Sequence, residues 1–220
     1  MDRSSAQAGT RDNLTLELAA TAARLIAEDG CDYATAKRKA AQLVLGDIAA
    51  ARGCLPENEL VETELRRYLR TFGGPRHAAL LAEMRATALA LMEYLAPFNP
   101  YLVGAVLNGT ATEHSTLHLQ LFTDSAKDVE IFLLDDGVRF TVDELNEPAG
   151  AFESIHLRVP RRLQAGGAAP LDAVLSVLST DAVRVVSRFR SSDPALSPIE
   201  QAGRASLSAV RALLAEAGDG

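Results

Sequence analysis

Residues 101–137 constrain the fold most, because signals for a strand, a glycine turn, a second strand and a helix follow one another there. Residues 101–107 form a compact apolar run that ends at the turn-forming pair Asn108-Gly109, and we interpret this run as a buried strand. Residues 117–121 alternate apolar and polar side chains with a period of two, which predicts a second strand.

The second predicted strand has two different faces, because alternate side chains of a strand point to opposite sides. Its three leucines face a core. Thr116, His118 and Gln120 share the other face, which is open or occupied by a ligand. Asp124 or Ser125 then begins a helix that ends at Gly137.

This order of elements resembles the core of the nucleotidyltransferase superfamily, the fold shared by polymerase β and the small nucleotidyltransferases. In that family a helix leads into a strand that ends in Gly-Ser or Gly-Gly, and the next strand carries two acidic residues separated by an apolar one. Gly104-Ala105 stands in the Gly-Ser place, and residues 115–119 read Ser-Thr-Leu-His-Leu where the family reads Ser-Asp-Ile-Asp-Leu. The resemblance implies an α+β fold: a small mixed sheet of nucleotidyltransferase type, flanked by helices and preceded by a helical N-terminal region.

The family's reaction needs two carboxylates on one face of one strand, because they hold two magnesium ions. Thr116 and His118 occupy those positions, and a hydroxyl and an imidazole bind Mg²⁺ poorly. Ala105 lacks the hydroxyl that would contact a triphosphate, and a predicted strand over residues 152–159 offers no third acid on its polar face. We therefore predict a non-catalytic binding or regulatory module for a nucleotide, a nucleic acid or a protein partner.

An active nucleotidyltransferase is the alternative prediction. It would transfer a nucleoside monophosphate from a nucleoside triphosphate to a protein, an RNA or a small molecule, with Mg²⁺ as cofactor. The nearest spare carboxylates for that reaction are Glu113, Asp124 and Asp128.

The candidate site surrounds the glycine turn and the polar strand face. His114, His118 and His156, with Glu113, suggest a transition-metal or proton-shuttle cluster only if the topology brings them together, and no sequence spacing predicts a metal site. Ser115 and His114 do not predict a hydrolase, because neighbours on a strand point to opposite faces. The predicted ligand-binding residues are Gly104, Ala105, Asn108, Gly109, Ser115, Thr116, His118 and His156.

Helical periodicity organises the residues before this segment. Residues 1–12 are small and polar and predict a disordered leader, residues 13–74 predict a helical region, and residues 75–220 predict the nucleotidyltransferase-like domain. The predicted helices cover residues 13–29, 31–45, 56–72 and 75–96. The first two faintly resemble the start of a helix-turn-helix regulator.

The second predicted helix carries Lys37, Arg38 and Lys39, a triplet that can bind the phosphates of a nucleic acid. Such a triplet is more often a solvated helix face. A net charge of −7 also argues against nucleic-acid binding through the overall electrostatic field.

The C-terminal elements are predicted from shorter patterns. Strands are predicted over residues 138–142, 152–159 and 183–189, a flexible loop over 143–150, a short helix over 171–178, and a closing helix on Leu207, Val210, Leu213 and Leu214.

Composition predicts a cytoplasmic protein. Apolar runs stay well short of the roughly 20 residues that span a bilayer, and residues 1–13 contain no apolar signal segment. Cys31 and Cys54 lack metal-type spacing, so we interpret them as reduced structural thiols.

Overall fold

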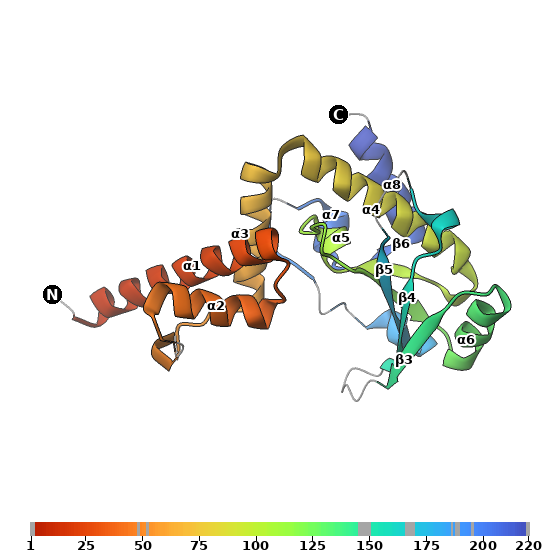
Figure 1. Cartoon of the computed structure of the whole chain (residues 1–220), viewed down its shortest axis with the longest axis horizontal. Helices are drawn as coiled ribbons and strands as arrows, with labels where there is room; N and C mark the ends of the chain where they lie inside the picture. Colours follow the sequence, from red (N-terminus) through yellow and green to blue (C-terminus); the bar gives the residue numbers. More distant parts are fainter. Residues whose placement is uncertain are drawn as a thin grey trace. The chain divides into compact units, whose positions relative to one another are not determined.

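The structure is a computed structural model that describes residues 3–47, 49–51, 53–144, 151–165, 170–185, 187, 190–194 and 196–218 (Figure 1). The chain divides into two compact units, Met1–Ala78 and Ala79–Gly220. The boundary falls within one helix, α4 (Gly74–Tyr94).

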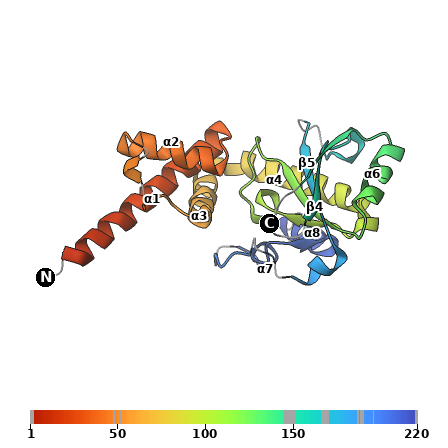
Figure 2. The same ribbon diagram turned by 90° about the horizontal axis from the view of Figure 1, so that it is seen from below.

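The first unit is helical, and α2 and α3 both pack against α1 (Figure 2). Its core is rich in alanine, and Ala22, Ala23, Ala36 and Ala40 are fully buried, which allows the helix backbones to approach closely. Its elements are α1 (Arg3–Asp29), α2 (Tyr33–Leu45), the 3-10 helix η1 (Ala49–Ala51), α3 (Asn58–Tyr68) and the π-helical turn η2 (Leu69–Gly73).

Helix α1 begins at Arg3, so residues 3–12 of the predicted disordered leader are helical, and residues 1 and 2 lie outside the described residues. This segment contains no proline, and its alanine, glutamine and arginine residues favour helix, so the helix that packs further along the chain extends through it. The start of α2 is capped by Asp32, whose side chain accepts a 2.9 Å hydrogen bond from the amide of Thr35.

The second unit is a six-stranded sheet with helices. Strands lie in the order β3-β4-β5-β2-β1-β6, and β2 pairs with β5 in parallel while the other pairs are antiparallel. Its remaining elements are η3 (Ala96–Phe98), β1 (Tyr101–Val103), α5 (Ala105–Asn108), β2 (Leu117–Phe122), α6 (Ala126–Asp135), β3 (Phe140–Glu144), β4 (Ala151–Arg158), η4 (Arg161–Leu163), β5 (Asp172–Leu178), η5 (Thr180–Arg184), α7 (Pro198–Gln201), β6 (Ala205–Ser206) and α8 (Leu207–Gly218).

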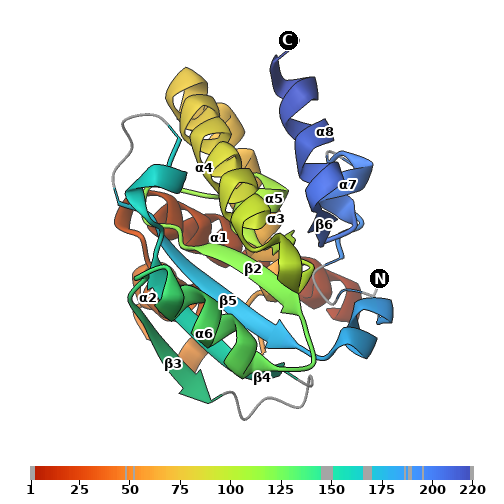
Figure 3. The same ribbon diagram turned by 90° about the vertical axis from the view of Figure 1, so that its right-hand side faces the viewer.

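Helices α4, α6 and α8 cover one face of this sheet (Figure 3). The predicted fold class is confirmed: the chain is α+β, with a mixed sheet, flanking helices and a helical N-terminal region.

The alternation predicted for β2 is confirmed. Leu117, Leu119 and Leu121 are fully buried beneath the helices, and His118 is exposed. The neighbouring strand β5 alternates in the same way, with Ala173, Leu175 and Val177 buried. The helix predicted after β2 is also confirmed: Ser125 accepts a hydrogen bond from the amide of Asp128 and caps α6.

Two strand predictions change in the structure. The run 101–107 is a strand only as far as Val103, because Gly104 adopts φ +73° and ψ −154° and starts the short helix α5. A strand over 183–189 is wrong at its start, since residues 183 and 184 belong to the 3-10 helix η5. Of the rest of that prediction, residues 186, 188 and 189 lie outside the described residues.

The helix predicted over 171–178 is wrong, because this segment is strand β5. β5 lies inside the sheet between β4 and β2, where both faces can accept apolar side chains. Its sequence is therefore nearly continuously apolar, and periodicity cannot separate such a strand from a short helix. The strands predicted over 138–142 and 152–159 are β3 and β4, and most of the loop predicted over 143–150 lies outside the described residues.

The register of β2 predicts which substitutions in this strand lower the free energy of unfolding. We expect Leu119→Ala to lower the free energy of unfolding by about 2–5 kcal/mol, because it leaves a cavity in the core. The adjacent substitution Gln120→Ala, on the other face, changes it by at most about 0.5 kcal/mol. Urea unfolding measures both, and a larger loss for Gln120→Ala would contradict the assigned faces.

Candidate functional site

The sheet face opposite α4, α6 and α8 carries polar side chains in rows that cross the strands. One row runs from Thr141 through His156, Val174 and His118 to Val103. His118 and His156 therefore flank Val174, two strand spacings or about 10 Å apart between backbones. The structure places both predicted histidines on one face.

The next row adds polar groups beside the two histidines. It contains Asp143, Ser154, Ser176, Gln120 and Tyr101, in strand order from β3 to β1. This face thus combines apolar side chains with hydroxyl, amide, imidazole and carboxylate groups.

Gly104 lies directly beside His118. A methyl group at the Gly104 Cα would lie 3.8 Å from the His118 Cβ, which is ordinary contact, so the positive φ rather than crowding requires glycine there. Thr116 is half-buried just before β2 begins. His118 therefore lies next to the glycine, and Thr116 directly precedes the strand that carries His118.

His156 has two polar neighbours on the same ring nitrogen. Its Nε2 lies 3.2 Å from the Ser154 Oγ and 3.3 Å from the Asp143 Oδ2. A nucleophile–base–acid relay needs serine and aspartate on opposite ring nitrogens, so this trio does not form one. The Ser115 Oγ contributes to the turn before β2, where it accepts a 2.9 Å hydrogen bond from the amide of Thr112.

The pKa of His118 is lowered from its usual value. Although the side chain is exposed to solvent, partial desolvation by the atoms packed around it is the main cause, and the positive charge that His156 can carry adds to it. The neutral imidazole of His118 is therefore favoured at neutral pH, in which state it offers one donor and one acceptor.

The other predicted ligand-binding residues shape the glycine turn. The carbonyl of Ala105 accepts hydrogen bonds from the amides of Thr110 and Ala111, and the Asn108 Oδ1 accepts from the amide and hydroxyl of Thr110. Gly109 has φ +80°. These contacts fix the path of the chain between α5 and β2.

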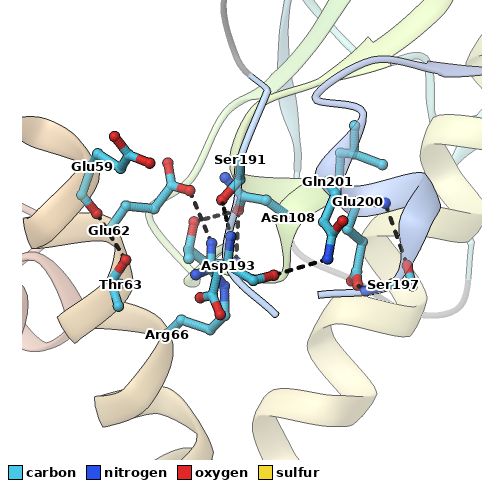
Figure 4. Close-up of polar contacts among 12 residues, drawn as sticks. Glu59, Glu62, Thr63, Arg66, Asn108, Ser191, Asp193, Ser197, Glu200 and Gln201 are labelled. Carbon is cyan, nitrogen blue, oxygen red and sulfur yellow. Dashed lines mark hydrogen bonds and ion pairs between the residues drawn. The ribbon is translucent and has the colours of Figure 1, made fainter. Parts of the chain in front are cut away.

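Arg85 and Glu200 support this turn, and the sequence analysis missed both. The Arg85 guanidinium donates to the carbonyls of Val106 (3.0 Å) and Leu107 (2.7 Å) and to the Glu200 Oε1 (2.7 Å), and its side chain is 8% exposed. Glu200 also forms a capping box with Ser197 at the start of α7 (Figure 4).

The ion pair keeps Glu200 charged in a partly buried position. Burial opposes ionisation, but hydrogen bonds from Ser197 and Arg85 outweigh it and lower the pKa of Glu200. The sequence pattern of α4 could not indicate that Arg85 is buried, because its partner Glu200 lies 115 residues further along the chain.

The basic triplet of α2 makes contacts within its own unit. Lys37 Nζ donates to the carbonyl of Pro56 (3.2 Å) and to the Asn58 Oδ1 (2.8 Å). Arg38 donates to the hydroxyl of Thr35, and Lys39 Nζ lies 3.3 Å from the Cys31 Sγ. Lys37 thus ties α2 to the segment that begins α3.

The three spare carboxylates lie apart. Glu113 is on an exposed turn before β2, and Asp124 follows the strand, where its Oδ1 accepts from the hydroxyl of Thr180. The six residues of β2 separate them by about 16 Å or more, whereas two catalytic metals lie about 4 Å apart. Asp128 belongs to the first turn of α6. Across the described ranges, no three His, Cys, Asp or Glu side chains gather as a metal site.

In comparisons of this chain with known proteins, no family model, curated protein or solved structure matches it. Within the described residues, none of the helices has the length and apolar character to cross a membrane.

The lowered pKa of His118 predicts a pH dependence of stability. The folded pKa lies below the unfolded value of 6.5, so the unfolded chain takes up more protons as pH falls from 7 through 6.5. Wild-type protein should lose stability over this window, and His118→Gln should lose less. Urea unfolding at pH 7.5 and 5.5 measures the difference, and an equal loss in both proteins would contradict the lowered pKa.

Proposed function

We propose that the second unit is a non-catalytic, nucleotidyltransferase-like module that binds a nucleotide on the polar face of its sheet. One observation carries the proposal: His118 lies beside Gly104, and the two positions at which the resemblance implies metal-binding acids carry Thr116 and His118.

The order of elements supports the nucleotidyltransferase-like layout. α4 leads into β1, Gly104 ends that strand, α5 follows, and β2 returns antiparallel to β1 before α6. β5 then lies parallel to β2 on its other side. This arrangement places the glycine turn beside the polar face of β2, where the family binds its nucleotide.

The side chains available as metal ligands argue against a nucleotidyl transfer that uses two magnesium ions. Mg²⁺ prefers carboxylate, phosphate and water oxygens, and the nearest spare acids, Glu113 and Asp124, lie at opposite ends of β2. Asp124 is also engaged with Thr180. In the two described rows of this face the carboxylate is that of Asp143, which pairs with His156, so these rows offer no pair of acids for two metal ions.

The same face suits a nucleotide's base and ribose. Small-molecule sites are mostly apolar, with a few well-placed polar groups, and here Val174 and Val103 form the floor between and beside His118 and His156. Imidazole, hydroxyl and amide groups can each pair with the edge of a base or a ribose hydroxyl. The acidic chain and the internal contacts of Lys37 favour a mononucleotide over a nucleic acid.

Thermal shift with ATP, GTP, CTP and UTP, each with and without Mg²⁺ or Mn²⁺, tests this function. We expect at least one nucleotide to raise the Tm equally with and without metal, and to release no pyrophosphate. A nucleotide at 100 times its Kd stabilises the fold by about 2.7 kcal/mol. His118→Ala should abolish the rise, and the matched control His77→Ala, in the first unit, should retain it.

Each other outcome argues against the proposal. No rise with any of the four nucleotides rejects nucleotide binding. Metal-dependent pyrophosphate release establishes the active enzyme instead. A salt-sensitive gel shift with DNA or RNA that is lost in Lys37→Ala and Arg38→Ala, without a mononucleotide effect, identifies a nucleic-acid-binding protein.

A further inference from the structure

Arg204 brings a guanidinium to the polar face of the sheet. It directly precedes Ala205 of β6, which pairs with Leu102 and is buried on the side of the helices. Alternate residues of a strand point to opposite sides, so Arg204 points to the polar face, as Tyr101 does. Its Cζ lies 5.2 Å from the centre of the Tyr101 ring and 5.1 Å from that of the Phe122 ring. The two rings contact each other edge to face.

The contacts of Arg204 hold its side chain without neutralising its charge. Its Nη2 donates hydrogen bonds to the carbonyls of Val183 (2.7 Å) and Val185 (3.1 Å), at the end of η5. Carbonyls and aromatic rings attract a guanidinium but carry no net charge. Among the described residues no carboxylate pairs with Arg204, which is half-buried, and its Nε and Nη1 carry further N–H donors. A ligand on the polar face can therefore meet an uncompensated cation.

The other charged groups of this face lie toward its opposite edge. On β3 and β4, the Asp143 Oδ2 lies 3.3 Å from the His156 Nε2. On β4 and β5, Arg158 pairs with Asp172 at 3.2 Å. The strand order β3-β4-β5-β2-β1-β6 puts Arg204 at the far end from both pairs. An anionic group on this face is therefore attracted to the β6 edge and repelled by the carboxylates near the β3 edge.

This arrangement gives a nucleotide a direction along the sheet. The proposed function places the base and ribose over Val174 and Val103, beside His118 and His156. β6 is the next strand beyond Val103, two strand spacings or about 10 Å from the backbone of His118. Phosphate groups attached to that ribose therefore approach the guanidinium of Arg204.

We propose that Arg204 binds the phosphate groups of the nucleotide, with the base directed toward β4 and β5 and the phosphates toward β6. The inference rests on the proposed function, in which binding needs no metal ion, so that another cation must offset the charge of the phosphates. A guanidinium suits this role because its charge-assisted N–H donors match phosphate oxygens.

Isothermal titration of the full chain without metal ions tests the phosphate contact. The ligands are ATP, GTP, CTP and UTP, their four nucleosides, and inorganic tripolyphosphate. We expect at least one triphosphate to bind the wild type about tenfold or more tightly than its nucleoside does, because the phosphates add charge-assisted hydrogen bonds. This advantage should shrink as the salt concentration rises.

Two variants with the same change of charge locate the contact. Arg204→Gln should weaken triphosphate binding by about tenfold or more and leave the affinity for the nucleoside within about twofold. The matched control is Arg211→Gln, which removes an exposed ion pair with Glu93 on the side of the helices. It should bind every ligand as the wild type does. Thermal unfolding establishes that both variants fold.

A measurement on the wild type does not require Arg204→Gln to fold. The Nε–H resonance of Arg204, assigned by triple-resonance experiments, should shift when the triphosphate is added and stay in place with the nucleoside. Arg204→Lys keeps the charge and should retain part of the triphosphate's advantage.

The outcomes separate this inference from the proposed function. Equal affinities of the triphosphate and its nucleoside for the wild type, or equal losses in Arg204→Gln and Arg211→Gln, would overturn the role of Arg204 and leave base and ribose binding in place. Tripolyphosphate that binds as tightly as any nucleotide, and is lost in Arg204→Gln, would support the phosphate site and reject a nucleotide as its ligand. If none of the ligands binds, both proposals are rejected.

Discussion

The burial of one face of β2 is the constraint on which the second unit depends. Leu117, Leu119 and Leu121 fill the core beneath the helices, and a one-residue slip would bury His118 and Gln120 in their place. Because β2 pairs with β1 on one side and β5 on the other, its register also sets which residues of those strands face the polar side. The chemistry available beside Gly104 is therefore decided by the packing of three leucines.

A second constraint fixes the turn that borders this face. Arg85 holds the carbonyls of Val106 and Leu107 from α4, and Glu200 holds Arg85 from α7. Loss of one partner of a buried ion pair leaves the other uncompensated and typically costs about 3–5 kcal/mol, so both ends of this contact are required together. Three segments distant in sequence thus converge on the turn, and the glycine between β1 and α5 keeps a fixed place beside His118.

Local patterns were enough to predict some elements and not others. The alternation of β2 and the Ser125 cap of α6 are signals carried by adjacent residues, and the structure has both. β5 was assigned as a helix because Val174 and Leu178 add apolar residues to its less buried face, which weakens the period of two in the sequence. The contact of Arg85 with Glu200 spans 115 residues, so no local pattern could indicate it. The juxtaposition of His118 and His156 likewise depends on β5 lying between their strands.

Placing acids at residues 116 and 118 tests the central proposal, that the side chains at these two positions prevent this face from binding a pair of metal ions. Isothermal titration with Mn²⁺ should show no saturable binding to the wild type, and saturable binding to the double variant Thr116→Asp, His118→Asp. Paramagnetic broadening should then affect the amides of β2 and Gly104 in the variant alone. Saturable Mn²⁺ binding to the wild type, with the same amides broadened, would contradict the account.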